Sequence, residues 1–251
     1  MSSDHTALAF ILDGPLQSWG TSSRFQRRST DPHPSKSGVL GMIAAALGID
    51  KYAPNESEQL RPLAALHFSV YRISRVIDEE RNSVLRLDDY HTVGGGYDEK
   101  AHWGNLSTPR KASGGAFGTV LTQREYLMDA VFAAVLQGPH SLLEKIASGL
   151  DNPVWGVWLG RKCCIPATPV FAAIADEPTS AVAEILSKAK AQGEKTESPA
   201  WSFLSNPVLL SRDLESGEST APQDGADTCI DQPLTYGLRQ HATRTVRHLS
   251  N

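Results

Sequence analysis

A buried helix is the clearest element that the hydrophobic pattern of the chain predicts. Residues 35–47 follow Pro34 and begin with two serines that can cap a helix, and Gly48 can end it in a left-handed conformation. Gly38 and Gly41 are costly inside a helix, so we expect another part of the chain to approach its backbone closely. Apolar side chains leave hardly any polar face, which predicts burial. They are Val39, Leu40, Met42, Ile43 and Leu47.

Four strands and a second helix are predicted around this segment. A polar connection, residues 50–62, follows the first helix. The order strand, helix, strand, insertion, strand, helix, strand is βαββαβ, which predicts an α+β fold of the ferredoxin-like or RRM-like class. The strands cover residues 6–13, 63–77, 124–137 and 154–171, and the second helix covers residues 140–150.

The insertion between the second and third strands, residues 78–123, has no regular pattern. It combines glycines, hydroxyls and aromatic rings with a basic pair, Arg110-Lys111. Such a long irregular segment inside a compact domain is either functional or disordered. Rings among glycines and basic groups favour function, because bases stack on rings while cations hold phosphates. The composition leaves disorder as the alternative.

Residues 175–251 differ in character and predict a small β-rich C-terminal domain, after a first domain of residues 1–174. An amphipathic helix, residues 180–191, leads through a polar linker to a strand-like segment. An acidic stretch around residues 213–231 contains glycines and proline, and we expect it to be mobile. The basic tail alternates in the manner of a β-hairpin.

Composition narrows the class of protein. The 251 residues are 40% hydrophobic and 21% charged, as in an ordinary globular protein. No apolar run reaches membrane-spanning length, and the N-terminus, with Asp4 and no basic region, does not read as a signal peptide. Cys163, Cys164 and Cys229 form no CxxC pair, so we expect a cytoplasmic protein with reduced cysteines.

The net charge of −4 argues against a protein that coats nucleic acid without specificity. The charge is segregated, however. Residues 176–231 hold 11 acidic and 4 basic residues, a local −7, which leaves 17 acidic and 20 basic residues elsewhere, or +3. A basic groove is therefore compatible with the overall composition.

The entrance of the first helix has the chemistry of an anion site. Arginines and a lysine stand beside two serines at a helix N-terminus, where free N–H groups favour phosphate. Guanidinium groups can bind two phosphate oxygens at once. The spacing is not that of a Walker loop, and the alternative is a solvated basic loop. The residues are Arg24, Arg27, Arg28, Ser35, Lys36 and Ser37.

With these residues, the chain resembles the CasD family of subunits from Cascade, the type I-E CRISPR surveillance complex. Six motifs carry the resemblance over most of residues 8–170, in order and at family-like spacing, while the C-terminal third carries little of it. The motifs are GPLQSWG (14–20), PxKSGVLG (34–41), AALGI (45–49), RLDDYHTV (86–93), QREYLMDA (123–130) and WLGRKCCIP (158–166).

The resemblance implies a repeat-associated (RAMP) fold of the RRM-like kind, whose insertion, residues 81–123, forms a thumb. It further implies a non-catalytic subunit that binds and caps the 5′ handle of CRISPR RNA (crRNA) in antiviral defence. The expected neighbours are the CasC backbone subunit and the large CasA subunit, with target DNA contacted only indirectly and no membrane or cofactor involved.

Carried over to this sequence, the resemblance assigns RNA-binding residues to three regions. The helix entrance supplies Arg24, Arg27, Arg28, Ser35, Lys36, Ser37 and Gly38. The thumb base supplies Arg86, Tyr90 and His91. The glycine-rich loop, which contains Gly156 and Gly160, supplies Arg161 and Lys162. Arg110 and Lys111 match only by their position in the thumb.

The competing hypothesis is a metal-independent endoribonuclease that processes precursor crRNA, as relatives in type I-C systems do. Its chemistry needs a base, an acid and a cation around a 2′-hydroxyl, which Tyr90, His91 and Lys111 could supply. The Lys-His neighbour pair of those relatives is absent from the sequence. A metal site is disfavoured, because His91 and His102 lie among acidic residues at no recognisable ligand spacing.

Overall fold

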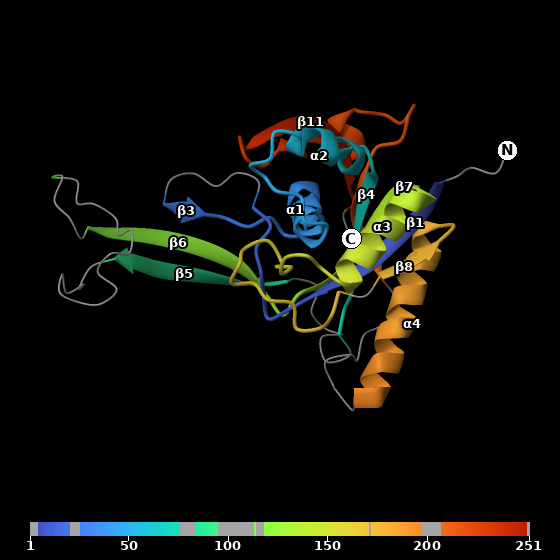
Figure 1. Ribbon diagram of the computed structural model, residues 1–251, viewed down its shortest axis with the longest axis horizontal. Helices are drawn as coiled ribbons and strands as arrows, with labels where there is room; N and C mark the ends of the chain where they lie inside the picture. Colours follow the sequence, from blue (N-terminus) through green and yellow to red (C-terminus); the bar gives the residue numbers. More distant parts are fainter. Residues whose placement is uncertain are drawn as a thin grey trace.

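The computed structural model describes residues 5–20, 26–75, 84–94, 113, 118–170, 172–196 and 207–249. It has a mixed α and β structure whose main sheet is antiparallel (Figure 1). The seven strands of this sheet lie in the order β10-β11-β9-β4-β7-β1-β8. Their bounds are β1 His5–Asp13, β4 His67–Arg72, β7 Val131–Pro139, β8 Ala172–Ala175, β9 Val208–Asp213, β10 Ala226–Thr235 and β11 Gln240–His248.

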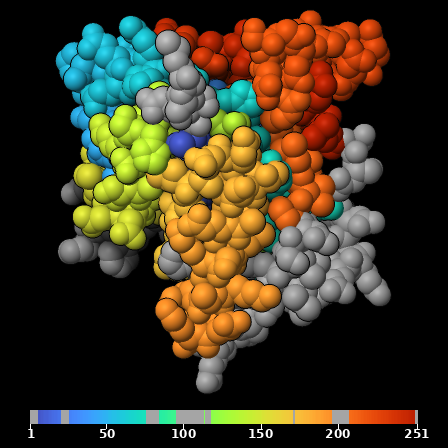
Figure 2. Space-filling view, turned by 90° about the vertical axis from the view of Figure 1, so that its right-hand side faces the viewer, coloured from blue at the N-terminus to red at the C-terminus, as the bar shows by residue number. Residues whose placement is uncertain are grey.

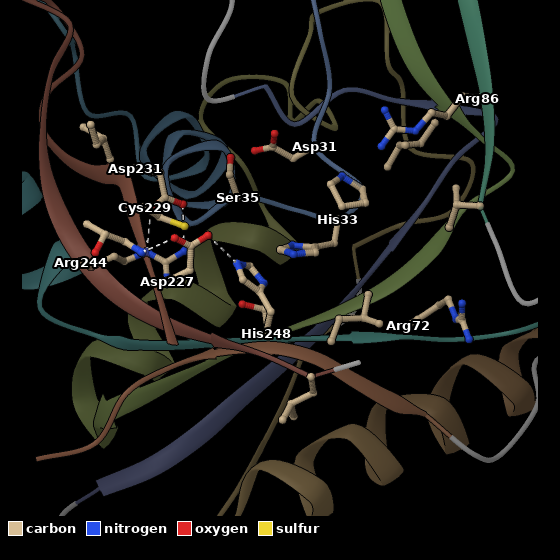
Figure 3. A pocket seen from close by; sticks show the side chains of 18 residues that line it. Asp31, His33, Ser35, Arg72, Arg86, Asp227, Cys229, Asp231, Arg244 and His248 are labelled. Atoms are coloured by element: carbon tan, nitrogen blue, oxygen red, sulfur yellow. Dashed lines mark hydrogen bonds and ion pairs between the residues drawn. The ribbon is translucent and has the colours of Figure 1, made fainter. Parts of the chain in front are cut away.

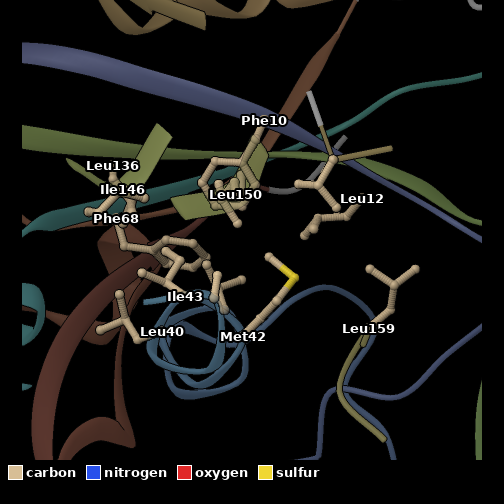
Figure 4. Close-up of a cluster of buried hydrophobic side chains, with 14 of the residues drawn as sticks. Phe10, Leu12, Leu40, Met42, Ile43, Phe68, Leu136, Ile146, Leu150 and Leu159 are labelled. Atoms are coloured by element: carbon tan, nitrogen blue, oxygen red, sulfur yellow. The ribbon is translucent and has the colours of Figure 1, made fainter. Parts of the chain in front are cut away.

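Helices cover both faces of the sheet, and β1 contributes alternate residues to each face. Its residues Leu8, Phe10 and Leu12 pack in the same core as α1 and α3, a core that Figure 4 shows from close by. The intervening residues of β1 pack in a second core, against α4. Because successive strand side chains point to opposite faces, this alternation follows directly from the strand geometry. The helices are α1 Lys36–Ala46, α2 Glu56–Ala64, α3 His140–Asp151 and α4 Pro178–Thr196, with a short 3-10 turn at Pro222–Asp224.

The predicted first helix is confirmed together with both of its caps. The Ser35 side chain accepts a hydrogen bond from the Gly38 N–H, and Gly48 has a φ of +72° just after the helix. Gly38 lies against the ring of Trp19, so a Cβ there would come within 2.8 Å of that ring. None of the described helices is long and apolar enough to cross a membrane.

Several predicted elements have different bounds in the structure. The supposed connection at residues 50–62 contains most of α2, whose Leu60 and Leu63 are buried one turn apart among polar neighbours. The strand predicted for residues 63–77 is only β4. The strand predicted for residues 124–137 is interrupted at Asp129, whose φ of +50° separates two strands. Residues 154–170 form a loop rather than a strand, because their backbone N–H groups bond partly within the loop and partly to α1 and β1 instead of to a neighbouring strand.

A long hairpin occupies both ends of the segment that we expected to be irregular. Strand β5 (Leu85–Gly94) pairs antiparallel with β6 (Thr119–Met128), and the hairpin projects from the body of the molecule (Figure 1). Two short strands, β2 (Leu16–Gln17) and β3 (Arg27–Arg28), pair with β6 to complete a four-stranded sheet. The hairpin has few buried side chains, so its sequence lacks the apolar run that marks a core strand.

The C-terminal strands continue the main sheet. Strand β9 pairs with β4, and β11 pairs with β9 and β10. The predicted hairpin is therefore present as β10 and β11, but the sheet has no break at residue 174, where the composition predicts a second domain. Helix α4 extends beyond residues 180–191 in both directions. Figure 2 shows its outer surface exposed between α3 and the C-terminal strands.

Candidate nucleic-acid interface

The GPLQSWG segment is a hydrogen-bonded support beneath the helix entrance. The Gln17 amide donates to the carbonyls of Leu12 (3.0 Å) and Ala130 (2.7 Å), and its oxygen accepts from the Trp19 indole at 2.9 Å. The Trp19 backbone N–H donates to the Thr30 hydroxyl at 2.8 Å. Trp19 is 1% exposed, so it is a buried packing anchor and offers no open face to a base. These bonds join the end of β1 to the arginine-rich loop, the segment that contains Arg27, Arg28 and Thr30.

The glycine-rich loop docks on this support at one position that only glycine can occupy. The Ser18 N–H donates to the Leu159 carbonyl at 3.1 Å. Gly160 has a φ of +91°, and a Cβ on it would lie 1.8 Å from the Ser18 carbonyl oxygen. A side chain at residue 160 would therefore force the loop away from Ser18. The close approach brings Arg161 to the arginine-rich strand.

Arg161 joins β3 to the base of the hairpin. Its Nη2 donates to the Arg28 carbonyl at 2.7 Å and its Nη1 to the Glu125 carbonyl at 3.1 Å. Its guanidinium carbon lies 4.7 Å from the centroid of the Tyr126 ring, within cation–π range. Arg161 therefore spends its donors on backbone carbonyls and acts as a positioning residue.

The register of the hairpin sorts the predicted RNA-binding residues onto two faces. Arg28 of β3 lies opposite Arg124 of β6 in a parallel pair. On β5, His91 lies opposite the β6 residue two positions before Arg124. These three side chains share one face, since paired residues point the same way. Arg27 and Tyr90 both pair with Gln123 and so lie on the other face. Arg27 and Arg28, which are adjacent in the sequence, therefore point to opposite faces of the sheet.

An arginine pocket lies on the first of these faces, at the start of α1. Its cavity volume is about 410 Å³, and Arg28, Arg124 and Arg161 line it together with Ser29 and Ser37. No carboxylate lines it, and within the described chain neither Arg28 nor Arg124 forms an ion pair. The pocket is therefore electropositive and offers hydroxyl and guanidinium donors to an anion. Gly38 contributes its backbone here, as the sequence predicts for the helix entrance.

Arg124 was not among the residues predicted from the sequence. It lies inside the QREYLMDA motif, and the alternation of that motif was the available signal. Which face it occupies depends on the pairing of β6 with β3, which the motif alone does not determine.

The opposite face carries arginines that are already paired. Arg27 Nη2 lies 2.9 Å from Glu125 Oε1, and Arg86 Nη1 lies 3.6 Å from Glu125 Oε2. The hydrogen bond from Arg27 lowers the pKa of the Glu125 carboxyl, and the charge of Arg86 acts in the same direction. Arg27 and Arg86 are thus less available to an external phosphate than Arg28.

A larger pocket of about 870 Å³ lies between the arginine-rich loop, the hairpin base and the C-terminal strands (Figure 3). His33 and His248 approach each other there, with ring centroids 5.7 Å apart. Burial lowers the pKa of His33, so its ring favours the neutral form. Arg86 lines this histidine pocket together with Asp31 and Asp227. Charges of both signs therefore meet in it.

Lys36 does not face a ligand, contrary to its predicted role. Its side chain is 3% exposed, and its Nζ lies 3.0 Å from Asp213 Oδ2. Its backbone N–H donates to Asp231 Oδ2 at 2.9 Å, so the carboxylate at this helix N-terminus belongs to the protein itself. Arg244 pairs with both aspartates. Burial opposes charge on Asp213, but Lys36 and Arg244 outweigh it and keep the pKa of Asp213 low.

The remaining predicted residues are divided between the surface and undescribed segments. Lys162 is exposed beside the ring of Trp158, and Ser37 Oγ lies 3.0 Å from His241 Nε2. Arg24, Arg110 and Lys111 lie outside the described residues. No group of three potential metal ligands comes together within the described part of the chain.

Comparisons with known proteins agree with this architecture. The family model described as CRISPR-associated protein (Cas_Cas5) matches residues 7–244. The CRISPR system Cascade subunit CasD of Escherichia coli (strain K12) is 31% identical in an alignment of 245 positions that covers 94% of this chain and 92% of that protein.

Two solved structures are similar as well. A chain of a CRISPR RNA-guided surveillance complex has a TM-score of 0.62 and 27% identity, with 97% of this chain and 89% of that chain covered. A crystal structure of a Cas protein has a TM-score of 0.54 and 27% identity, with 97% and 93% covered. The chain therefore belongs to the CRISPR-associated Cas5 protein family.

Proposed function

We propose that this chain is a non-catalytic subunit of a Cascade complex and binds the 5′ handle of crRNA in antiviral defence. The observation that carries the proposal is the arginine pocket, which is lined by three arginines and by no carboxylate. The similarity to a Cascade subunit over nearly the whole chain supports the same function. RNA phosphates are the anions that such a site suits.

In this proposal, Arg28 and Arg124 hold phosphate oxygens of a single-stranded handle. The guanidinium fork binds two oxygens of one phosphate, and the Ser29 and Ser37 hydroxyls add further donors. Arg161 keeps β3 and β6 together so that the two arginines remain on one face. Unstacked bases of the strand are then free to be read at their edges.

The finer fold assignment belongs to the same proposal. The strands β4-β7-β1-β8 lie side by side, with α1 and α2 between β1 and β4 in the chain and α3 between β7 and β8. This order supports a ferredoxin-like core with βαββαβ connections. The projecting β5–β6 hairpin supports a thumb. The proposed neighbours are the CasC backbone and CasA large subunits in the cytoplasm, with target DNA contacted through the complex.

The hairpin register argues against the competing endoribonuclease. Tyr90 and His91 are adjacent on β5 and therefore point to opposite faces, so they do not meet on one phosphate. His91 Nδ1 instead lies 3.5 Å from Asp89 Oδ2. Incubating the purified chain with a repeat RNA, with and without a chelator, tests this. Site-specific cleavage that disappears in His91→Ala would establish the nuclease.

Binding of a synthetic handle RNA to the full-length chain tests the proposed function. The double variant Arg28→Ala/Arg124→Ala should bind about a hundredfold more weakly or worse, because hydrogen bonds to charged groups contribute about 1.5–3 kcal/mol each. Arg61→Ala is the matched control, since Arg61 lies exposed on α2 and lines none of the pockets described here. Equal affinity of the wild type and the double variant would place the RNA elsewhere.

A further inference from the structure

A second groove lies beside the arginine pocket and has no role in the function proposed above. Its cavity volume is about 600 Å³. Small residues of α1 form one wall, including Gly41 and Ala45, and the rings of Trp155, Trp158 and Tyr236 line the remainder. Three of its lining residues also line the arginine pocket: Ser37, Gly38 and Gly160. The two cavities are therefore neighbours along the same helix.

Trp155 is fixed by its backbone while its ring stays open to solvent. Its N–H donates to the Ala45 carbonyl at 3.2 Å, and the Val154 N–H donates to the Ala46 carbonyl at 2.9 Å. These carbonyls lie in the last turn of α1, where intrahelical donors run out, so the loop acts as a helix cap. The residue as a whole is nevertheless 44% exposed. An exposed tryptophan whose backbone is hydrogen-bonded to a helix end can offer an aromatic face to a flat ligand.

The charge next to these rings is positive. Lys162 Nζ lies 5.7 Å from the Trp158 ring centroid, and Lys162 forms no ion pair within the described chain. Lys51 lines the groove too, and so does Asp50, whose Oδ1 accepts from the Tyr52 N–H. Aromatic faces combined with lysines, continuous with an arginine pocket, match the chemistry of single-stranded nucleic acid better than that of an apolar peptide.

We propose that this tryptophan groove stacks nucleobases of the RNA strand as it leaves the arginine pocket. Trp155, the more exposed of the two tryptophans, supplies the stacking face, and Lys162 contacts the adjoining phosphate. The inference rests on the proposed RNA-binding function, because it extends the path of that same strand. Stacking of this kind tolerates any base, so the groove would add affinity rather than sequence preference.

The test compares three variants of one residue in the full-length chain. Trp155→Ala should bind handle RNA about 5- to 150-fold more weakly, which corresponds to about 1–3 kcal/mol for one stacked base. Trp155→Phe, which keeps an aromatic face, should retain most of the affinity. Trp155→Leu keeps an apolar side chain without a ring and should behave like Trp155→Ala. Circular dichroism establishes that all three are folded, and ultraviolet cross-linking maps the RNA to residues 155–162.

The outcomes separate this inference from the proposed function. Weaker binding by the arginine double variant but unchanged binding by all Trp155 variants would overturn only the tryptophan groove. No binding of RNA by the wild-type chain would overturn the proposed function as well. Normal RNA binding by Trp155→Ala, combined with failure to assemble into Cascade, would overturn the stacking role and identify the groove as a protein-docking surface.

Discussion

The Arg161 guanidinium donates a 2.7 Å hydrogen bond to the backbone carbonyl of Arg28, a residue 133 positions earlier in the chain. Through this bond, the glycine-rich loop and the arginine-rich strand form one unit at the edge of the hairpin. Because a backbone carbonyl has no net charge, this bond does not neutralise the positive charge of Arg161. It holds β3 in place and leaves the pocket electropositive. The geometry of the pocket therefore depends on a residue that itself contributes few free donors.

Replacing Arg161 with lysine should weaken this unit. A lysine ammonium is a point charge that does not reach both carbonyls while stacking on Tyr126, so Arg161→Lys should lose about 1–2 kcal/mol of unfolding free energy. Urea denaturation measures the loss. Lys162→Met, at the exposed neighbouring position, should change the stability by no more than about 0.5 kcal/mol. Equal stabilities for the wild type and Arg161→Lys would contradict the positioning role.

The salt dependence of RNA binding should distinguish adjacent arginines. Arg28→Ala should reduce the slope of log affinity against log salt by about 0.7, the value for one lost contact with single-stranded RNA. Arg27→Ala should reduce it less, because Glu125 already pairs with Arg27. Titrations at several salt concentrations measure both slopes. A larger effect at Arg27 than at Arg28 would assign the RNA to the opposite face of the hairpin.

Asp213 should be more important for stability than its buried partner Lys36. Asp213→Ala removes the carboxylate that is hydrogen-bonded to the buried Lys36 ammonium, and breaking such a buried pair typically costs about 3–5 kcal/mol. Lys36→Met should cost less, since Asp213 keeps Arg244 and the Phe68 N–H at 2.9 Å. Chemical denaturation of the two variants gives the comparison. The reverse order would mean that Lys36 is the more important member.

A buried carboxyl should make stability fall as the pH rises from about 4 to 6. Burial raises the pKa of Asp13 from 3.8 to about 6, and its ion pair with Arg75 offsets this only in part. The folded state then holds a proton that the unfolded state has released, so raising the pH favours unfolding, by about 3 kcal/mol in total. Asp13→Asn should lack this component. Unfolding free energies measured across this range test it, and parallel curves for the two proteins would disprove it.

Shortening the hairpin should spare the fold but not the assembly. The register of β5 and β6 ends at the pair Gly94 and Thr119, so replacing residues 95–117 with a short Gly/Ser turn leaves the described pairs intact. The variant should unfold at the wild-type urea concentration. If the hairpin is a thumb, the variant should fail to retain the handle or to join the backbone subunit. Normal co-purification with both would show that the removed residues have neither role.

The sequence alone predicted those helices and strands whose capping residues and apolar pattern lie within a few residues of one another. Helix α1 was predictable because its cap, its apolar faces and its terminal glycine are neighbours in the chain, and Ser35 and Gly48 act as expected. Strand β1 was predictable because both faces of it are buried, which requires a continuous apolar run. Motifs of this local kind also carried the resemblance to the CasD family.

The tertiary structure alone decided which charged residues face a ligand. Lys36 belongs to a basic, hydroxyl-rich motif, yet it is bonded to two aspartates from distant parts of the chain. Its Nζ donates to Asp213, 177 residues away, and its backbone N–H donates to Asp231, 195 residues away. Arg27 and Arg28 are adjacent residues of the same type, but the pairing of β3 with β6 places Arg27 beside Glu125 and Arg28 in the arginine pocket. The direction of a side chain depends on the strands that the fold brings beside it, and no local pattern in the chain encodes that pairing.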